Sequence, residues 1–122
     1  MRGGDRNTLG HWGEEQAAQF LQRNGYGILE TRYRKREGEV DLIAENNGFL
    51  CFVEVKLRKN TRMGEAREYV TASKQRKVRI AAEYYLMEHP GGLQPRFDVI
   101  EVYAPGGTET ASPVIRHWEN AF

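Results

Sequence analysis

Apolar residues recur with a helical period in two segments of the chain, and they alternate with polar residues or run together in several others. The first periodic segment predicts an amphipathic helix over residues 9–24, which an Asn-Gly pair would end. The second predicts a helix over residues 71–88 that starts at Thr71, a favourable N-cap, and stops at the sequence HPGG. Both helices should bury one face against other elements of the protein.

Strand-like segments lie between the two helices and after the second. The expected strands cover residues 26–34, 38–45, 49–58, 96–103 and 114–118. The sequence Asn-Asn-Gly at 46–48 predicts a hairpin turn, and residues 59–70 have no clear period and predict a loop. The order α-β-β-β-α-β predicts one α/β domain over residues 1–122, with a central mixed sheet flanked by helices and a flexible tail at 1–8.

Composition narrows the class of protein only a little. The chain has 122 residues and a net charge of +1, and its single cysteine, Cys51, is expected to be a small buried residue. One cysteine excludes both an internal disulfide and a zinc-thiolate cluster. No apolar run approaches the roughly 18 residues of a membrane helix, and the N-terminus lacks the apolar core of a signal peptide. These features predict a cytoplasmic protein without a membrane partner.

Basic residues are concentrated in the middle of the chain. Residues 32–79 contain 13 Lys or Arg against 7 Asp or Glu, and most of these cations fall in the sequences RYRKR, KLRKNTR and KQRKVR. Such clusters are typical of phosphate-binding surfaces, although each of them alone could be a solvated face.

Three charged residues interrupt segments that otherwise read as buried strands. Strand alternation places Glu54 and Lys56 on one face, and pairing around the predicted hairpin turn brings Asp41 close to Glu54. On the earlier strand, the same alternation predicts that Val40 and Leu42 share a face. The three charges could form a cross-strand salt-bridge cluster. They could also form a site for a hard divalent cation, which takes one or two carboxylates beside substrate phosphate.

Other charged residues require a separate reading. Glu14 lies on the apolar face of the first helix, in line with Ala17 and Leu21. It could join the acidic pair, or it could be a first-turn acid that the helix dipole stabilises. Asp98 and Glu101 also interrupt an apolar strand, but no lysine follows Glu101 at two residues. For these two acids we expect structural roles, and for His117 and Trp118 we expect packing roles.

Asp41 followed at a distance by Glu54-Val55-Lys56 resembles the signature of the PD-(D/E)XK nuclease superfamily. Over about residues 9–102 the chain also resembles the YraN-like bacterial family. The resemblance lies in the sequences GHWGEEQAAQFLQRNGYGILETRYRKREGEVDLIAENNGFLCFVEVKLR, AREYVTASKQRKVRIAAEYYL and RFDVIEV. That family is described as Holliday-junction-resolvase-like or as predicted endonucleases. The resemblance therefore implies a restriction-endonuclease-like αβββαβ core and nuclease activity.

The resemblance also implies roles for individual residues. The implied ligands of Mg²⁺ or Mn²⁺ are Asp41, Glu54, the carbonyl of Val55 and Glu14. The implied catalytic residues are Asp41, Glu54, Lys56, Glu14 and Gln75. Gln75 shares a helix face with Val78 and Ala82, and it could equally be a capping or surface amide. Two positions depart from the family pattern: Val40 replaces a proline or isoleucine before the first aspartate, and Arg32 replaces an asparagine.

The sequence as a whole favours a metal-dependent endonuclease that hydrolyses phosphodiester bonds in DNA, with branched or damaged DNA as candidate substrates. The candidate phosphate contacts are Arg32, Arg34, Arg36, Arg58, Lys74 and Arg76. Because resolvase-like relatives tend to be dimers, a homodimer is a further expectation. Two alternatives keep the fold without the catalysis: a nucleic-acid-binding module and a protein-interaction subunit.

Overall fold

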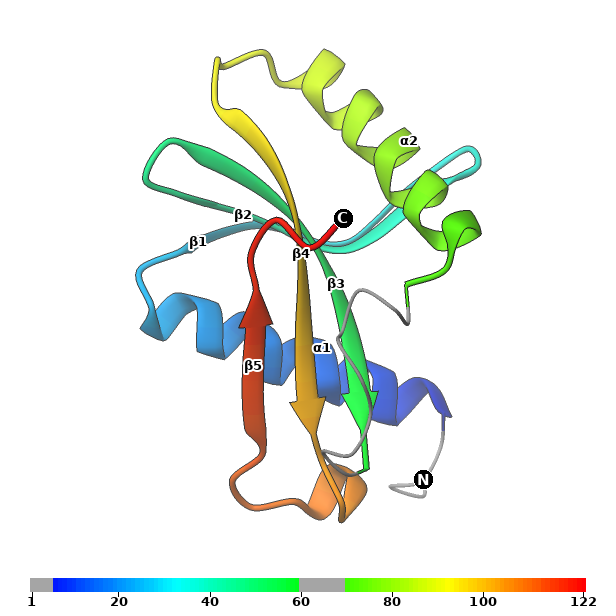
Figure 1. Ribbon diagram of the computed structural model, residues 1–122, viewed down its shortest axis with the longest axis vertical. Helices are drawn as coiled ribbons and strands as arrows, with labels where there is room; N and C mark the ends of the chain where they lie inside the picture. The colour runs from blue at the N-terminus through cyan, green and yellow to red at the C-terminus, as the bar shows by residue number, and fades with distance from the viewer. Residues whose placement is uncertain (1–5, 60–69) are drawn as a thin grey trace.

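A computed structural model describes residues 6–59 and 70–122 of the chain (Figure 1). Its elements are α1 (Arg6–Arg23), β1 (Gly27–Lys35), β2 (Gly38–Asn46), β3 (Phe49–Arg58), α2 (Ala72–Glu88), β4 (Gln94–Tyr103), a 3-10 turn η2 (Gly107–Glu109) and β5 (Val114–Trp118). The predicted α-β-β-β-α-β order is confirmed. The first helix begins earlier than expected, at Arg6, and the rest of the expected tail lies outside the described residues, as does most of the loop predicted at 59–70.

The described strands form one five-stranded sheet in the order β1-β2-β3-β4-β5. β3 and β4 are parallel and the other neighbours are antiparallel, so the sheet is mixed, as predicted. The hairpin turn between β2 and β3 lies where the sequence places it. Asn47 and Gly48 there have φ of 52° and 84°, which is the backbone that a two-residue type I′ turn requires. This turn fixes the β2–β3 register, in which Asn46 pairs with Phe49.

The two helices cover opposite faces of the sheet (Figure 1). Leu42 and Val53 pack in the core beneath α1, whereas their neighbours Ile43 and Phe52 pack beneath α2. Cys51 is fully buried on the α1 side, as expected, and burial raises the pKa of its thiol to about 12. No helix within residues 6–59 and 70–122 has the length and apolarity needed to cross a membrane.

The prediction that Val40 and Leu42 share a face of their strand is wrong. Leu42 belongs to the core beneath α1, but Val40 belongs to the core beneath α2. The paired strand β1 contains the physical reason, because Arg32 lies between the residues that pair with Val40 and Leu42 and has a left-handed φ of 54°. The tip of the β1–β2 hairpin is therefore rotated relative to its base, and the rotation occurs at Asp41.

Gly38 lets α2 approach this rotated hairpin tip closely. A Cβ atom at position 38 would lie 2.7 Å from the backbone nitrogen of Ala81 and 2.9 Å from Cγ2 of Ile80. A helix backbone cannot move aside locally, so Gly38→Ala must displace α2 or the hairpin. We expect the variant to lose about 1–3 kcal/mol of its free energy of unfolding, measured by urea denaturation.

Gly27→Ala is the matched control for this substitution. At position 27 the nearest atom to an added Cβ is Cγ of Glu45, at 3.7 Å, an ordinary contact with a flexible side chain. Equal stability changes in the two variants would show that the contact with α2 is not tight.

Candidate functional site

The sheet opens into a fork at the point where the predicted acidic residues lie. The β2–β3 ladder ends at the pair Leu42–Val53, whereas β3 remains paired with β4 as far as Arg58. Figure 1 shows the hairpin tip lying beside α2 while β3 continues along β4 toward the other end of the molecule. Backbone groups of β2 and β3 beyond the fork are therefore released from the ladder and can serve a site.

Asp41 and Glu54 meet at this fork. Extending the register by one step places them opposite each other, and Oδ2 of Asp41 accepts a hydrogen bond of 2.8 Å from the backbone N–H of Val55. The N–H and C=O groups of one strand residue point to the same edge, so the Val55 carbonyl faces the same gap. Two carboxylates and a backbone carbonyl are thus gathered where the strands separate.

Glu54 is a buried acid with a strongly raised pKa. Its side chain is only 5% exposed, and its Oε1 has no hydrogen-bond partner among the described residues. Burial, followed by the negative charge of Asp41, raises the pKa of Glu54 to about 8, and the charges of Lys74 and Lys56 act against this rise. A buried acceptor without a donor is costly, and a cation at Oε1 would remove that cost.

Glu14 reaches the same fork from α1. Its carboxylate lies 3.3 Å from Nε of Arg32, and the Glu14 side chain is half-buried. Burial raises the pKa of Glu14, and the charge of Asp41 raises it further, against the opposing charges of Arg32 and Arg34. Asp41 is therefore close enough to raise the pKa values of both Glu14 and Glu54.

Two lysines border the acids. Lys56 follows Glu54 on the same strand, is half-buried, and lowers the pKa of Glu54 by its charge. Lys74, on the first turn of α2, places its amine 2.5 Å from Oε2 of Glu39 and 3.8 Å from Oε2 of Glu54. The sequence suggested Lys74 as a phosphate contact and did not connect it with these acids, because a helix and a strand distant in sequence have no spacing that could be counted.

The oxygens at the fork fit a hard divalent cation. Mg²⁺ and Mn²⁺ bind carboxylate and carbonyl oxygens and retain several waters, and the fork offers Asp41, Glu54 and the Val55 carbonyl. No three His, Cys, Asp or Glu side chains in the described ranges are close enough together to hold a metal by themselves. The residues therefore suit a partly hydrated ion better than one enclosed by side chains alone.

Gln75 lies next to the site but is turned toward the backbone. Its Nε2 donates a hydrogen bond of 2.9 Å to the carbonyl of Val70, just before the N-terminus of α2. Val78 and Ala82, which share its helix face, are buried as expected. The amide thus links the first turn of α2 to the backbone that leads into it.

The six candidate phosphate contacts divide into two groups. Arg34, Arg36 and Arg76 are exposed, two of them on the β1–β2 hairpin and one on α2. Each of the other three pairs with an acid: Arg32, which is exposed too, with Glu14, Lys74 with Glu39, and Arg58 with Glu101. Arg58 is only 12% exposed and lies 3.1 Å from a fully buried carboxylate, so the structure gives it an internal role.

Asp98 and Glu101 have internal partners, in line with the structural roles expected for them. Asp98 accepts hydrogen bonds from Arg96, from the ring of His117 and from the backbone of Asn120. Glu101 accepts hydrogen bonds from Tyr103, Trp118 and Arg58. His117 and Trp118 thus donate hydrogen bonds to buried acids, a role that the expected packing did not include.

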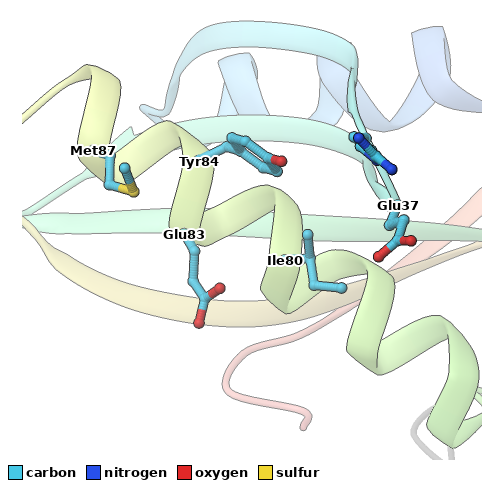
Figure 2. A pocket seen from close by; sticks show the side chains of 6 residues that line it. Glu37, Ile80, Glu83, Tyr84 and Met87 are labelled. Atoms are coloured by element: carbon cyan, nitrogen blue, oxygen red, sulfur yellow. The ribbon is translucent and has the colours of Figure 1, made fainter.

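A separate surface cavity of about 600 Å³ lies between the turn that joins β1 to β2 and the outer side of α2 (Figure 2). Its lining residues are Arg36, Glu37, Ile80, Glu83, Tyr84 and Met87. None of the acids at the fork lines it. The candidate site is therefore defined by the convergence of charged groups at the fork and not by this hollow.

The fold and the fork define an α/β protein with a mixed sheet and a site of two carboxylates beside lysine. The chain matches the profile of the uncharacterised protein family UPF0102 over residues 13–102. It belongs to this family, which is the YraN-like family that the sequence resembles.

Individual relatives support the same assignment. A UPF0102 protein of Syntrophotalea carbinolica is 42% identical over 118 residues, which cover 96% of this chain and 93% of the relative. One of Chlorobium chlorochromatii is 44% identical over 116 residues, covering 93% and 90%. The UPF0102 protein FP2501 of Flavobacterium psychrophilum is 36% identical over 118 residues, covering 97% and 96%. The similarity thus extends over nearly the whole length of each protein.

Proposed function

We propose that the protein is a Mg²⁺- or Mn²⁺-dependent endonuclease that hydrolyses phosphodiester bonds in DNA, with branched or damaged DNA as candidate substrates. The observation that carries the proposal is the buried Oε1 of Glu54, which has no partner in the described residues and faces Asp41 at a fork bordered by Lys56. A salt-bridge cluster on a solvated sheet would leave its acids exposed, whereas Glu54 is buried.

Each residue of the fork has a role in this proposal. Asp41, Glu54 and the Val55 carbonyl would hold the cation, which when bound lowers the pKa of a coordinated water and offsets phosphate charge. Lys56 would hydrogen-bond the attacking water and a phosphate oxygen. Glu14 would be an additional or water-bridged ligand of the cation, and its pair with Arg32 would hold its carboxylate toward the fork. Gln75 would support the backbone that leads into α2.

The proposed DNA surface surrounds the fork. Arg34 and Arg36 project from the hairpin and Arg76 from α2, and all three are exposed. Arg34 is close enough to lower the pKa values of both Glu14 and Glu39. Contacts of this type would make binding fall steeply with salt. DNA is thus the proposed partner, and the expected homodimer likewise stays a proposal.

The function is tested by incubating the protein with four-way junctions, flaps, single strands and duplexes in the presence of Mn²⁺. Asp41→Asn removes a metal ligand, and Lys56→Ala removes the amine beside the reacting water. We expect each variant to cleave the preferred substrate about 100-fold more slowly than the wild type. Lys59→Ala is the matched control, because Lys59 is exposed one residue beyond β3.

The possible outcomes separate the classes of function. Equal residual cleavage by the wild type, Asp41→Asn and Lys56→Ala would refute the assignment. Metal-independent retardation of DNA on gels without cleavage of any substrate would instead indicate a nucleic-acid-binding module. Negligible affinity for every nucleic acid at moderate salt would indicate a protein-interaction subunit.

A further inference from the structure

Lys74 occupies a fixed place beside the acids of the fork. Its amine lies 2.5 Å from Oε2 of Glu39 on β2 and 3.8 Å from Oε2 of Glu54 on β3. Its backbone N–H donates a hydrogen bond of 3.1 Å to Oγ1 of Thr71, the N-cap of α2. The side chain is 22% exposed, so it is held between the helix and the two strands and does not extend into solvent.

This position makes Lys74 a cation that the chain itself supplies to the carboxylates. Its amine contacts only one oxygen of Glu54, namely Oε2, and Oε1 remains without a partner in the described chain. A metal ion at Oε1 and the amine near Oε2 would therefore share one carboxylate. Two positive charges separated by one carboxylate repel each other, so Lys74 must weaken the binding of a divalent cation while it stabilises the metal-free site.

We propose that Lys74 is the internal counter-cation of the carboxylate fork and sets how tightly the fork binds a divalent metal ion. This inference rests on the proposed metal site. Lys74 holds Glu39 and Glu54 together when no metal is bound, and it limits the affinity for metal when one is available. The amine is too deeply engaged with these two acids to act as a surface phosphate contact.

The test measures Mn²⁺ binding by isothermal titration calorimetry in the absence of DNA. Lys74→Met keeps the length of the side chain and removes its charge. We expect Mn²⁺ to bind Lys74→Met about tenfold more tightly than the wild type. Without metal, the variant should have a thermal midpoint lower by about 4 °C, because Glu39 and Glu54 lose their shared cation.

Glu39→Gln provides an independent test that does not depend on the folding of Lys74→Met. This variant removes the other partner of Lys74 and leaves the amine to Glu54, so we expect Mn²⁺ affinity to fall about threefold. The matched controls are Lys77→Met, three residues after Lys74 on α2, and Glu37→Gln, at the tip of the β1–β2 hairpin, and both remove exposed charges. Each control should change the affinity less than twofold.

The outcomes distinguish this inference from the proposed function. Asp41-dependent binding of Mn²⁺ with equal affinity in Lys74→Met and Lys77→Met would overturn the role of Lys74 and leave the metal site intact. Unchanged or tighter binding in Glu39→Gln would also overturn it. If neither the wild type nor Lys74→Met binds Mn²⁺ in a way that Asp41→Asn abolishes, the metal site and the counter-cation are both rejected.

Discussion

Asp98→Asn is expected to lower the free energy of unfolding by about 3–5 kcal/mol. Asp98 is fully buried, and its carboxylate receives Nη2 of Arg96 at 2.8 Å and Nε2 of His117 at 2.8 Å. Asparagine has a similar shape but no charge, and one of its oxygens becomes an NH₂ group that cannot accept a hydrogen bond. Arg96, which is only 11% exposed, would keep its charge without the carboxylate that neutralises it. Urea denaturation at neutral pH measures the loss.

The control for Asp98 is Glu119→Gln. Glu119 also faces Arg96, at 3.7 Å, but it is 60% exposed, so its removal should change stability by less than about 0.5 kcal/mol. Burial acts to raise the pKa of Asp98, but the hydrogen bonds from His117, Arg96 and Asn120 outweigh it and lower this pKa. The stabilisation is therefore present above the ordinary pKa of 3.8 and is lost as the pH falls through the lower folded-state value. A gap between wild type and Asp98→Asn that does not narrow in acid would contradict this explanation.

Glu54→Gln is expected to stabilise the metal-free protein, and by an amount that grows with pH. The pKa of Glu54 is raised from an ordinary value of 4.5 to about 8, by burial first and by the charge of Asp41 second. The folded protein therefore holds a proton that the unfolded chain has lost between these two values. The stability of the wild type falls by at most about 1.4 kcal/mol per pH unit across this window and levels off above it.

Glutamine does not ionise, so the variant avoids this loss. We expect the two proteins to be equally stable near pH 4.5 and Glu54→Gln to be more stable by about 4 kcal/mol near pH 9. Urea denaturation in a chelating buffer at several pH values measures the difference. Glu45→Gln is the control, because Glu45 is exposed on β2. Parallel pH profiles for the wild type and Glu54→Gln would show that Glu54 ionises normally.

The raised pKa of Glu54 also connects the stability of the protein with the proposed metal binding. A site that destabilises its own ionised carboxylate gains more from a bound cation than an exposed pair of acids would. Added Mn²⁺ should therefore raise the stability of the wild type most at alkaline pH and leave Glu54→Gln almost unchanged.

Local patterns in the sequence predicted much of the fold. The strands at 49–58 and 114–118 have the predicted bounds, and the turn residues Asn47 and Gly48 fixed the β2–β3 register by counting. That count alone placed Asp41 close to Glu54. The helical period likewise turned Glu14 toward the core, where its pKa responds to Asp41.

Other features depend on contacts that no local pattern encodes. The rotation of the hairpin at Asp41 needs a left-handed backbone at Arg32, and arginine gives no signal of that conformation. The pair Lys74–Glu54 depends on where α2 settles against the sheet. Arg58 meets Glu101 because β3 and β4 are parallel neighbours, and a parallel register is not set by a short turn whose residues can be counted.

The early end of the β2–β3 ladder affects how mutations can alter this site during evolution. A side-chain ligand is lost by one substitution, but the carbonyl of Val55 is present whichever amino acid occupies position 55. What removes that oxygen from the gap is an extension of strand pairing past Leu42 and Val53. The main-chain part of the site is thus inherited with the shape of the sheet, and only its acidic part is open to loss by a point mutation.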